Sequence, residues 1–255
     1  MFIWQPELSL SVLRLCRLRM VWYLAFGSNM STKVLVDRRK IEPSESHPVV
    51  VQDYQLTFNV PGIPYWEPSF ASILPRKGKK LHGVIYNVSE QDFKRIQRSE
   101  GGAGIKGLGY QPVDIAVTTY SGDKYIARTL YYNCNLFPNI REFHPSKRYL
   151  NLILDGAMEH HLDADYIGKL ENLQYYDACS ISEKVSKYLF LFPVFLTVVP
   201  FAIVYFTILK NFHISVDWLL KTVHYMLYLL YLFHDLIWIK VLPGGLKEEK
   251  MVLNE

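Results

Sequence analysis

The chain has 255 residues, of which 50% are hydrophobic and 15% aromatic, and its formal net charge is +4. This length allows one domain with additions or two small domains. The basic residues are scattered, and no basic stripe with interleaved aromatic rings is present, so nucleic acid is excluded as an expected partner. Three isolated cysteines argue against a disulfide framework and favour a reducing compartment.

The first predicted element is a strand over residues 21–26, preceded by an N-terminal extension, residues 1–19, that is expected to be poorly ordered. The strand breaks into Gly27-Ser28-Asn29-Met30, and Ser31 is expected to cap a short helix that ends near Arg39. A loop between a strand and a helix can direct several backbone N–H groups at one point. Such a loop is a ready site for an anion or a polarised oxygen.

More strands and a helix follow. Strands are predicted over residues 49–59, 70–74 and 81–88. The basic run at residues 76–80 is interpreted as a solvated hairpin turn between the last two strands. Ser89 is expected to cap a helix that runs to about Ser99 and turns Phe93 and Ile96 inward.

The next strands, residues 110–120 and 124–133, are predicted to form a hairpin around Ser121-Gly122-Asp123. From Ser146 the pattern becomes helical, and another helix is expected over residues 164–175. Strands in mostly hairpin order predict an α+β fold. We expect a small, mostly antiparallel β-barrel with helices outside it.

The last part of the chain differs in composition. Residues 188–209 contain no charged residue and are long enough to cross a bilayer as a helix, so a transmembrane helix is predicted there. Residues 218–242 are apolar apart from one polar helical stripe, and two interpretations fit: a second spanning helix, or an amphipathic helix in the membrane interface. The stripe comprises Lys221, His224, Tyr228, Tyr231, Asp235 and Trp238.

These patterns predict a globular domain over residues 20–186, a membrane segment over residues 187–242 and a polar tail over residues 243–255. Lys184 and Lys187 precede the uncharged run, so the positive-inside rule places the globular domain on the cytosolic side. The expected protein is therefore membrane-anchored, with the lipid bilayer as a partner.

Four blocks of the sequence, in this order, resemble the γ-glutamylcyclotransferases. The blocks are residues 25–30, 81–88 with the helix after them, 99–110 and 145–157. In that family the first strand ends in Tyr-Gly-Ser-Asn and a catalytic Glu lies far downstream. Here Phe26 replaces the Tyr, and Glu100, followed by two glycines, matches the acid. The resemblance covers about residues 21–177 and implies the same barrel fold.

The resemblance also implies a reaction. The α-amino nitrogen of a γ-glutamyl substrate attacks the side-chain carbonyl, which releases 5-oxoproline and a free amino acid or amine. Glu100 is then the expected general base and, afterwards, the general acid. The implied substrate-binding residues are Phe26, Gly27, Ser28, Asn29, Met30, Tyr110 and Tyr149. No cofactor is expected, because nucleophile and electrophile share one molecule, and Glu159-His160-His161 lacks the spacing of a metal site on a helix.

Two alternatives stay open on the sequence. The same scaffold could act on a bulkier glutathione-derived conjugate or on a γ-glutamylamine. A protein that keeps the pocket but performs no reaction would instead be a membrane-anchored binding module. The sequence does not identify the amine that leaves.

Overall fold

The structure is a computed structural model that describes residues 20–100, 110–132, 142–178, 180–212 and 217–241. Inside the last two ranges, the structure does not describe the side chains of residues 197–199, 201–212, 217–221, 223, 224, 227 and 239. The N-terminal extension, the polar tail and the two glycines after Glu100 therefore fall outside the described residues.

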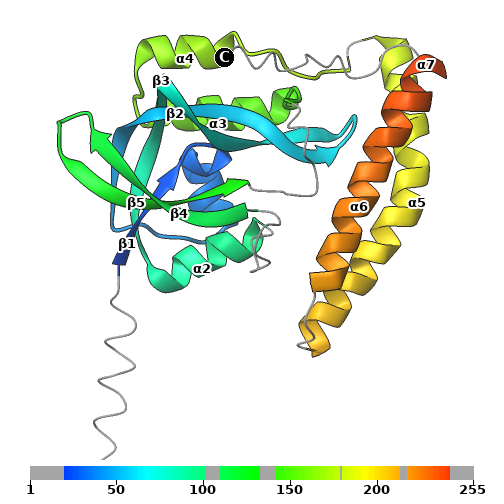
Figure 1. The fold of residues 1–255 in the computed structure, drawn as a ribbon, viewed down its shortest axis with the longest axis horizontal. Coiled ribbons are helices and arrows are strands. Elements are labelled where there is room, and N and C mark those ends of the chain that lie inside the picture. Colours follow the sequence, from blue (N-terminus) through cyan, green and yellow to red (C-terminus); the bar gives the residue numbers. More distant parts are fainter. Residues whose placement is uncertain (1–19, 101–109, 133–141, 179, 213–216, 242–255) are drawn as a thin grey trace, which may run out of the picture. The chain divides into compact units, whose positions relative to one another are not determined.

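Strands dominate the first half of the described chain and helices the second (Figure 1). The elements are β1 (Met20–Ala25), η1 (Ser28–Met30), η2 (Lys33–Arg38), β2 (Glu45–Ile63), β3 (Glu67–Ser89), α2 (Glu90–Ser99), β4 (Tyr110–Thr119), β5 (Lys124–Tyr132), α3 (Lys147–Glu159), α4 (Ala164–Glu171), α5 (Ile181–Phe212), α6 (Asp217–Phe233), η3 (His234–Trp238) and α7 (Ile239–Val241).

The strands close into a barrel in the order β1-β3-β2-β4-β5. β1 runs antiparallel to β3, with Tyr23 opposite Tyr86, and it meets β5 in parallel where Tyr23 lies opposite Arg128. β4 is antiparallel to β2, with Val49 opposite Thr119, and antiparallel to β5 along its whole length. The predicted small, mostly antiparallel barrel with flanking helices is therefore confirmed.

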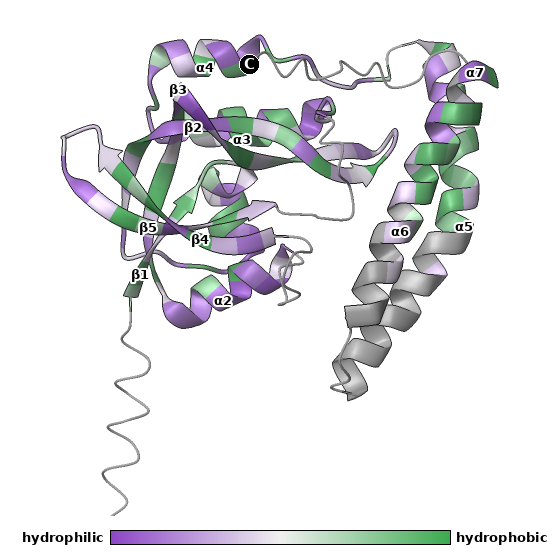
Figure 2. Ribbon diagram, viewed as in Figure 1, coloured by the Kyte–Doolittle hydropathy of each residue, from purple (hydrophilic) through white to green (hydrophobic). Residues whose placement is uncertain are grey.

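The helix after β3 forms as the sequence predicts, and it determines where Glu100 lies. Ser89 Oγ accepts the Asp92 N–H at 3.0 Å, which caps the first turn of α2. Phe93 and Ile96 are buried, while the other side of α2 is hydrophilic (Figure 2). The packing of this amphipathic helix on the barrel fixes its C-terminal end, where Glu100 follows Ser99.

β3 differs from the prediction, because it is one strand of 23 residues. The predicted turn at residues 76–80 is wrong. A basic run is typical of a solvated turn, but here it lies in the sheet with most of its side chains exposed. Gly78 N–H donates to Asp53 Oδ1 at 2.7 Å, and its φ of +78° is a conformation that glycine adopts without strain.

The predicted cap of the first short helix is also wrong in its chemistry. η2 is a wide π-helical segment preceded by Thr32, and no side chain caps it. Instead, the backbone carbonyl of Ser31 accepts the N–H groups of Val34 and Leu35, both at 2.9 Å. The helix position agrees with the prediction, but backbone groups rather than the Ser31 hydroxyl begin it.

The described chain forms two compact units. The first contains β1, α2, β4, β5, α4, most of β3, the first part of β2 and residues 151–159 of α3. The second contains the connection between β2 and β3 (residues 57–71), residues 142–150 and the chain from residue 173 onward. The β2–β3 hairpin tip thus belongs with the C-terminal helices.

In the second unit, residues 188–209 lie inside α5, and the predicted segment 218–242 corresponds to α6, η3 and α7. Within the part of the chain that the structure describes, no helix combines the length and apolar character needed to cross a bilayer. The predicted transmembrane helix is therefore not supported. Two members of the polar stripe, Lys221 and His224, have side chains outside the description.

Two other members of the stripe, Trp238 and Tyr231, make hydrogen bonds within this unit. Trp238 Nε1 donates to Ser186 Oγ of α5 at 3.1 Å, which joins the two C-terminal helices. Tyr231 donates its hydroxyl to the carbonyl oxygen of Pro68, at the hairpin tip, at 2.5 Å. A buried apolar cluster of Tyr65, Phe190, Leu191 and Val194 forms the core of this unit.

Candidate active site

The site begins with the loop after β1. Its turns are closed by its own backbone: Met30 N–H donates to the Gly27 carbonyl at 3.0 Å and Ser31 N–H to the Ser28 carbonyl at 3.1 Å. Asn29 and Met30 are buried, while Gly27 and Ser28 are half-buried. The Met30 amide is therefore engaged inside the loop. The expectation of amide donors for a ligand then rests on Gly27, Ser28 and Asn29.

Tyr86, a buried residue of β3, supports this loop. Its hydroxyl donates to the Met30 carbonyl oxygen at 2.7 Å. Burial raises the pKa of Tyr86 far above its ordinary value, so the hydroxyl stays protonated and keeps donating. His160 Nε2 lies 2.7 Å from the same hydroxyl, and burial lowers the pKa of His160. Since the hydroxyl hydrogen goes to Met30, we assign the donor role in this second contact to His160.

The C-terminal half of α3 packs on the same loop. A Cβ atom at Gly156 would lie 2.6 Å from Ser31 N and 2.7 Å from Met30 C, so only glycine allows this close approach. One turn later, Glu159 Oε2 accepts the Thr32 N–H at 3.0 Å, and Glu159 Oε1 accepts the Thr32 hydroxyl. The loop is thus held from β3 on one side and from α3 on the other.

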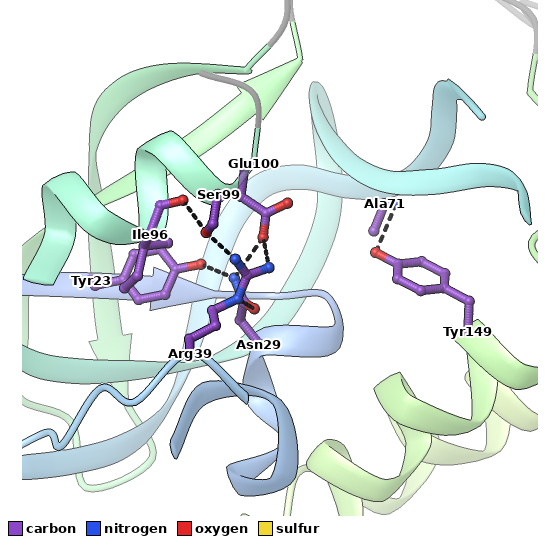
Figure 3. A network of polar contacts seen from close by, with 8 residues as sticks. All are labelled: Tyr23, Asn29, Arg39, Ala71, Ile96, Ser99, Glu100 and Tyr149. Atoms are coloured by element: carbon purple, nitrogen blue, oxygen red, sulfur yellow. Dashed lines mark hydrogen bonds and ion pairs between the residues drawn. The ribbon is translucent and has the colours of Figure 1, made fainter. Parts of the chain in front are cut away.

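Glu100 meets this loop at the Asn29 side chain (Figure 3). Asn29 Nδ2 donates to Glu100 Oε1 at 3.1 Å and to the Tyr23 hydroxyl at 2.8 Å. The Glu100 side chain is 25% exposed, so its carboxylate is partly shielded but still open to a ligand. The fold brings together two residues that lie 71 positions apart in the sequence.

Arg39 is a component that the sequence did not reveal. It follows η2, and its guanidinium contacts Asn29, Ser99 and Glu100 together. Nε donates to Asn29 Oδ1 at 2.8 Å, and Nη2 pairs with Glu100 Oε1. In the sequence Arg39 stands between Arg38 and Lys40, and nothing in that basic run distinguishes it. Only the contact with the acid identifies it.

The remaining predicted binding residues lie in different surroundings. Phe26 is buried directly before the loop. Tyr110 begins β4 and meets Tyr132 edge to face, with ring centroids 5.9 Å apart. Tyr149 belongs to the second unit, where its hydroxyl accepts the Ala71 N–H at 3.2 Å. The structure therefore brings Asn29 and Glu100 together, and it describes Tyr149 only within its own unit.

No group of three or more His, Cys, Asp or Glu side chains that could hold a metal occurs among the described residues. Glu159 and His160, which stood out in the sequence as acidic and imidazole neighbours, contact Thr32 and Tyr86. Their position is explained by support of the loop.

Solved structures share this fold. A structure described as gamma-glutamyl cyclotransferase matches with a TM-score of 0.54 and 21% identity, and it covers 64% of this chain and 92% of that one. A human protein described as uncharacterized matches with a TM-score of 0.53 and 22% identity, over 63% of this chain and 92% of that one. At such identities the likeness shows the fold alone. The fold class is that of the γ-glutamyl cyclotransferase barrel.

Sequence comparisons identify the family. Residues 80–170 match the AIG2-like family. A gamma-glutamyl cyclotransferase of Aspergillus fumigatus, gliK, is 32% identical over 196 residues, which cover 67% of this chain and 69% of that protein. The chain belongs to the γ-glutamyl cyclotransferase family, so the assignment made from the sequence is confirmed.

Two further relatives show how far the similarity extends. The gamma-glutamyl cyclotransferase aclK of Aspergillus oryzae is 35% identical over 173 residues, and the chain spans 61% of its length. The gamma-glutamylcyclotransferase of Bos taurus is 27% identical over 157 residues, which cover 60% of this chain and 78% of the bovine protein.

Proposed function

We propose that the protein is a γ-glutamyl cyclotransferase that acts on a small γ-glutamyl compound. One observation carries the proposal: Asn29 Nδ2 lies 3.1 Å from Glu100 Oε1, so the loop after β1 and the acid at the end of α2 meet. A ligand seated on the loop is then within reach of the carboxylate. Family membership supports this interpretation.

The proposed reaction needs a base first and an acid afterwards. Glu100 accepts a proton from the substrate's α-ammonium group, and the freed nitrogen pair attacks the side-chain amide carbon, closing a five-membered ring. Glu100 then gives its proton to the leaving nitrogen as the amide C–N bond breaks. The ring nitrogen loses two protons in all and the leaving amine gains two. Neither water nor a cofactor therefore enters the balance.

The loop supplies positioning. The backbone amides of Gly27, Ser28 and Asn29 are proposed to bind a substrate oxygen, either the α-carboxylate or the oxyanion that develops at the amide. Phe26, Met30, Tyr110 and Tyr149 are proposed, on the family resemblance, to form the rest of the binding surface. Holding the amine near the carbonyl contributes to the rate, since ring closure needs one geometry out of many.

The test uses the full chain, because the hairpin tip and the C-terminal helices form one unit. Incubation with γ-glutamyl-alanine is expected to release 5-oxoproline and alanine in equal amounts. Glu100→Gln is expected to reduce kcat by about 10²–10⁴-fold, the range for losing a general acid–base group. Glu171→Gln, an exposed carboxylate on α4, is the matched control and should leave kcat unchanged.

A substrate panel separates the alternatives. γ-Glutamyl-alanine, glutathione, a glutathione S-conjugate and a γ-glutamylamine are compared by kcat/KM. A higher kcat/KM for the conjugate or the γ-glutamylamine would identify the alternative in which the same scaffold acts on these larger or different substrates. Binding of these compounds with no release of 5-oxoproline would instead identify a binding module and contradict the enzymatic proposal.

We also propose that the C-terminal helices attach the protein to a lipid bilayer with the barrel on the cytosolic side. The uncharged run supports this proposal, together with the exposure of large apolar side chains along α5, such as Phe192 at 68% and Leu196 at 62%. Flotation of the full chain with phosphatidylcholine vesicles tests it. Recovery of all the protein in the lipid-free fraction would contradict it.

A further inference from the structure

The Arg39 guanidinium connects three residues of the candidate site. Each of its three nitrogens donates to a different residue: Nε to Asn29 Oδ1 at 2.8 Å, Nη1 to Ser99 Oγ and Nη2 to Glu100 Oε1 (Figure 3). Its side chain is 19% exposed. A planar guanidinium has a fixed fork of donors, so these contacts determine the relative orientation of the three partners.

The first consequence concerns the Asn29 amide. Because Arg39 Nε donates to Oδ1, the amide must present Nδ2 on its other side. Nδ2 then donates to both Glu100 Oε1 and the Tyr23 hydroxyl. Arg39 therefore selects the one orientation of Asn29 in which the loop contacts the acid.

The second consequence concerns the two oxygens of Glu100. Both side-chain contacts, from Asn29 and from Arg39, go to Oε1. Over the described ranges, Oε2 receives no hydrogen bond or ion pair. The described residues thus hold the carboxylate by one oxygen and leave the other without a contact. This asymmetry is what a proton carrier needs if it is to stay in place while it exchanges a proton.

Arg39 is itself held in place by contacts at both ends of its side chain. Ser99, which accepts from Arg39 Nη1, donates its own hydroxyl hydrogen to the Ile96 carbonyl at 2.7 Å. At the other end, Arg39 N–H donates to the Val34 carbonyl at 3.1 Å and closes η2. Arg39 thereby links the loop side of the site to the last turn of α2.

We infer that Arg39 is a positioning residue that occupies Glu100 Oε1 and reserves Oε2 to accept the proton of the substrate's ammonium group, an inference that rests on the proposed cyclotransferase function. Arg39 itself transfers no proton, since its guanidinium stays charged. In its absence the carboxylate can rotate, and the Asn29 amide loses its fixed orientation.

The test compares Arg39→Ala and Arg39→Lys with Arg38→Ala, all in the full chain with γ-glutamyl-alanine. Arg38 is the neighbouring arginine, exposed and outside the network. Arg39→Ala is expected to lower kcat by about a hundredfold, the cost of misplacing a catalytic group by about 1 Å, with KM changed less than threefold. Arg39→Lys, which keeps a charge but not the fork, should be intermediate. Arg38→Ala should match the wild type.

Chemical rescue separates positioning from a loss of folding. Guanidinium ion at millimolar concentration is expected to restore part of kcat in Arg39→Ala, since it carries the same planar fork of donors, and to leave Arg38→Ala unchanged. If Arg39→Ala shows no cooperative melting, it is not folded, and the kcat of Arg39→Lys is used instead to test the inference. A kcat within twofold of wild type in the folded variant, or a loss that appears only in KM, would overturn the inference.

The wild-type measurement keeps the two proposals apart. Release of 5-oxoproline by wild type with no effect of the Arg39 variants rejects the role of Arg39 only. No release by wild type on any γ-glutamyl compound rejects the proposed function, and the inference with it.

Discussion

Each of the two units contains a polar network that includes a carboxylate, and the two networks differ in the burial of the carboxylate's partners. In the first, Glu100, Asn29 and Arg39 lie around one partly exposed carboxylate. In the second, the hydroxyl of Tyr65 lies 3.0 Å from His234 Nε2, and Asp235 Oδ1 lies 2.9 Å from His234 Nδ1. Tyr65 and His234 are fully buried.

The difference indicates that a polar network with a carboxylate can contact a ligand in one unit and stabilise the fold in the other. Both nitrogens of His234 have partners, so the imidazole at the centre of the second network has no nitrogen left for a ligand. Its buried contacts join the hairpin tip to the C-terminal helices, and breaking them leaves a buried polar group unpaired. In the first network, none of the described residues contacts Glu100 Oε2. We therefore expect changes in the first to reduce catalysis and changes in the second to reduce stability.

After Glu100→Gln, the largest expected effect comes from Asn29→Asp, which keeps the shape of the side chain but removes the two donors of Nδ2. A second carboxylate then faces Glu100, and the loop no longer holds it. We expect kcat/KM for γ-glutamyl-alanine to fall about 10²–10³-fold, as when one preorganised donor is removed. An activity within threefold of wild type would show that the contact between Asn29 and Glu100 is incidental.

Gly156→Ala tests whether the loop must keep its position. The added methyl group would lie 2.6 Å from Ser31 N, so the loop or α3 must move. We expect about 1–3 kcal/mol of destabilisation and a kcat reduced about tenfold or more, since small misplacements are costly. Gly168→Ala is the matched control: a Cβ there meets nothing within 4 Å, and the change should stabilise α4 slightly.

Tyr65→Phe addresses the second network. Loss of the hydroxyl leaves His234 Nε2 buried without this partner, which is expected to cost about 1–3 kcal/mol in the free energy of unfolding. The kcat of the folded protein should change less than twofold. Tyr188→Phe, at a ring that is 70% exposed, is the control and should leave both quantities unchanged. A large loss of kcat in Tyr65→Phe would contradict the proposal that the second network serves stability and not catalysis.

The smallest expected effect is a dependence of stability on pH at His160. Burial lowers the pKa of this imidazole below its ordinary 6.5, so the folded state favours the neutral form. The neutral imidazole therefore contributes to the free energy of unfolding. This contribution is complete above pH 6.5 and is lost as the pH falls through the lower pKa of the folded state. Between pH 7.5 and 5, unfolding by denaturant should show a smaller decrease in stability for His160→Gln than for wild type. Equal decreases would contradict this origin.

Patterns within short stretches of sequence predicted much of the barrel. The Ser89 cap and the Gly122 hairpin turn depend on neighbouring residues, so a sequence contains the information for them. The family resemblance added Glu100 and the loop, 71 positions apart. The continuous strand through Gly78 was not predicted, because the contact between Gly78 and Asp53 joins two strands and is not visible in either stretch of sequence alone.

The sequence by itself determined the order of most strands and helices, since turns and caps are local properties, and the family resemblance singled out Glu100 and the loop. Only the tertiary structure decided that Arg39 rather than Arg38 contacts Glu100, and that His234 contacts Tyr65. Identical side chains at adjacent positions point in different directions from a helical turn. The partner each one reaches depends on which distant segment the fold places beside it.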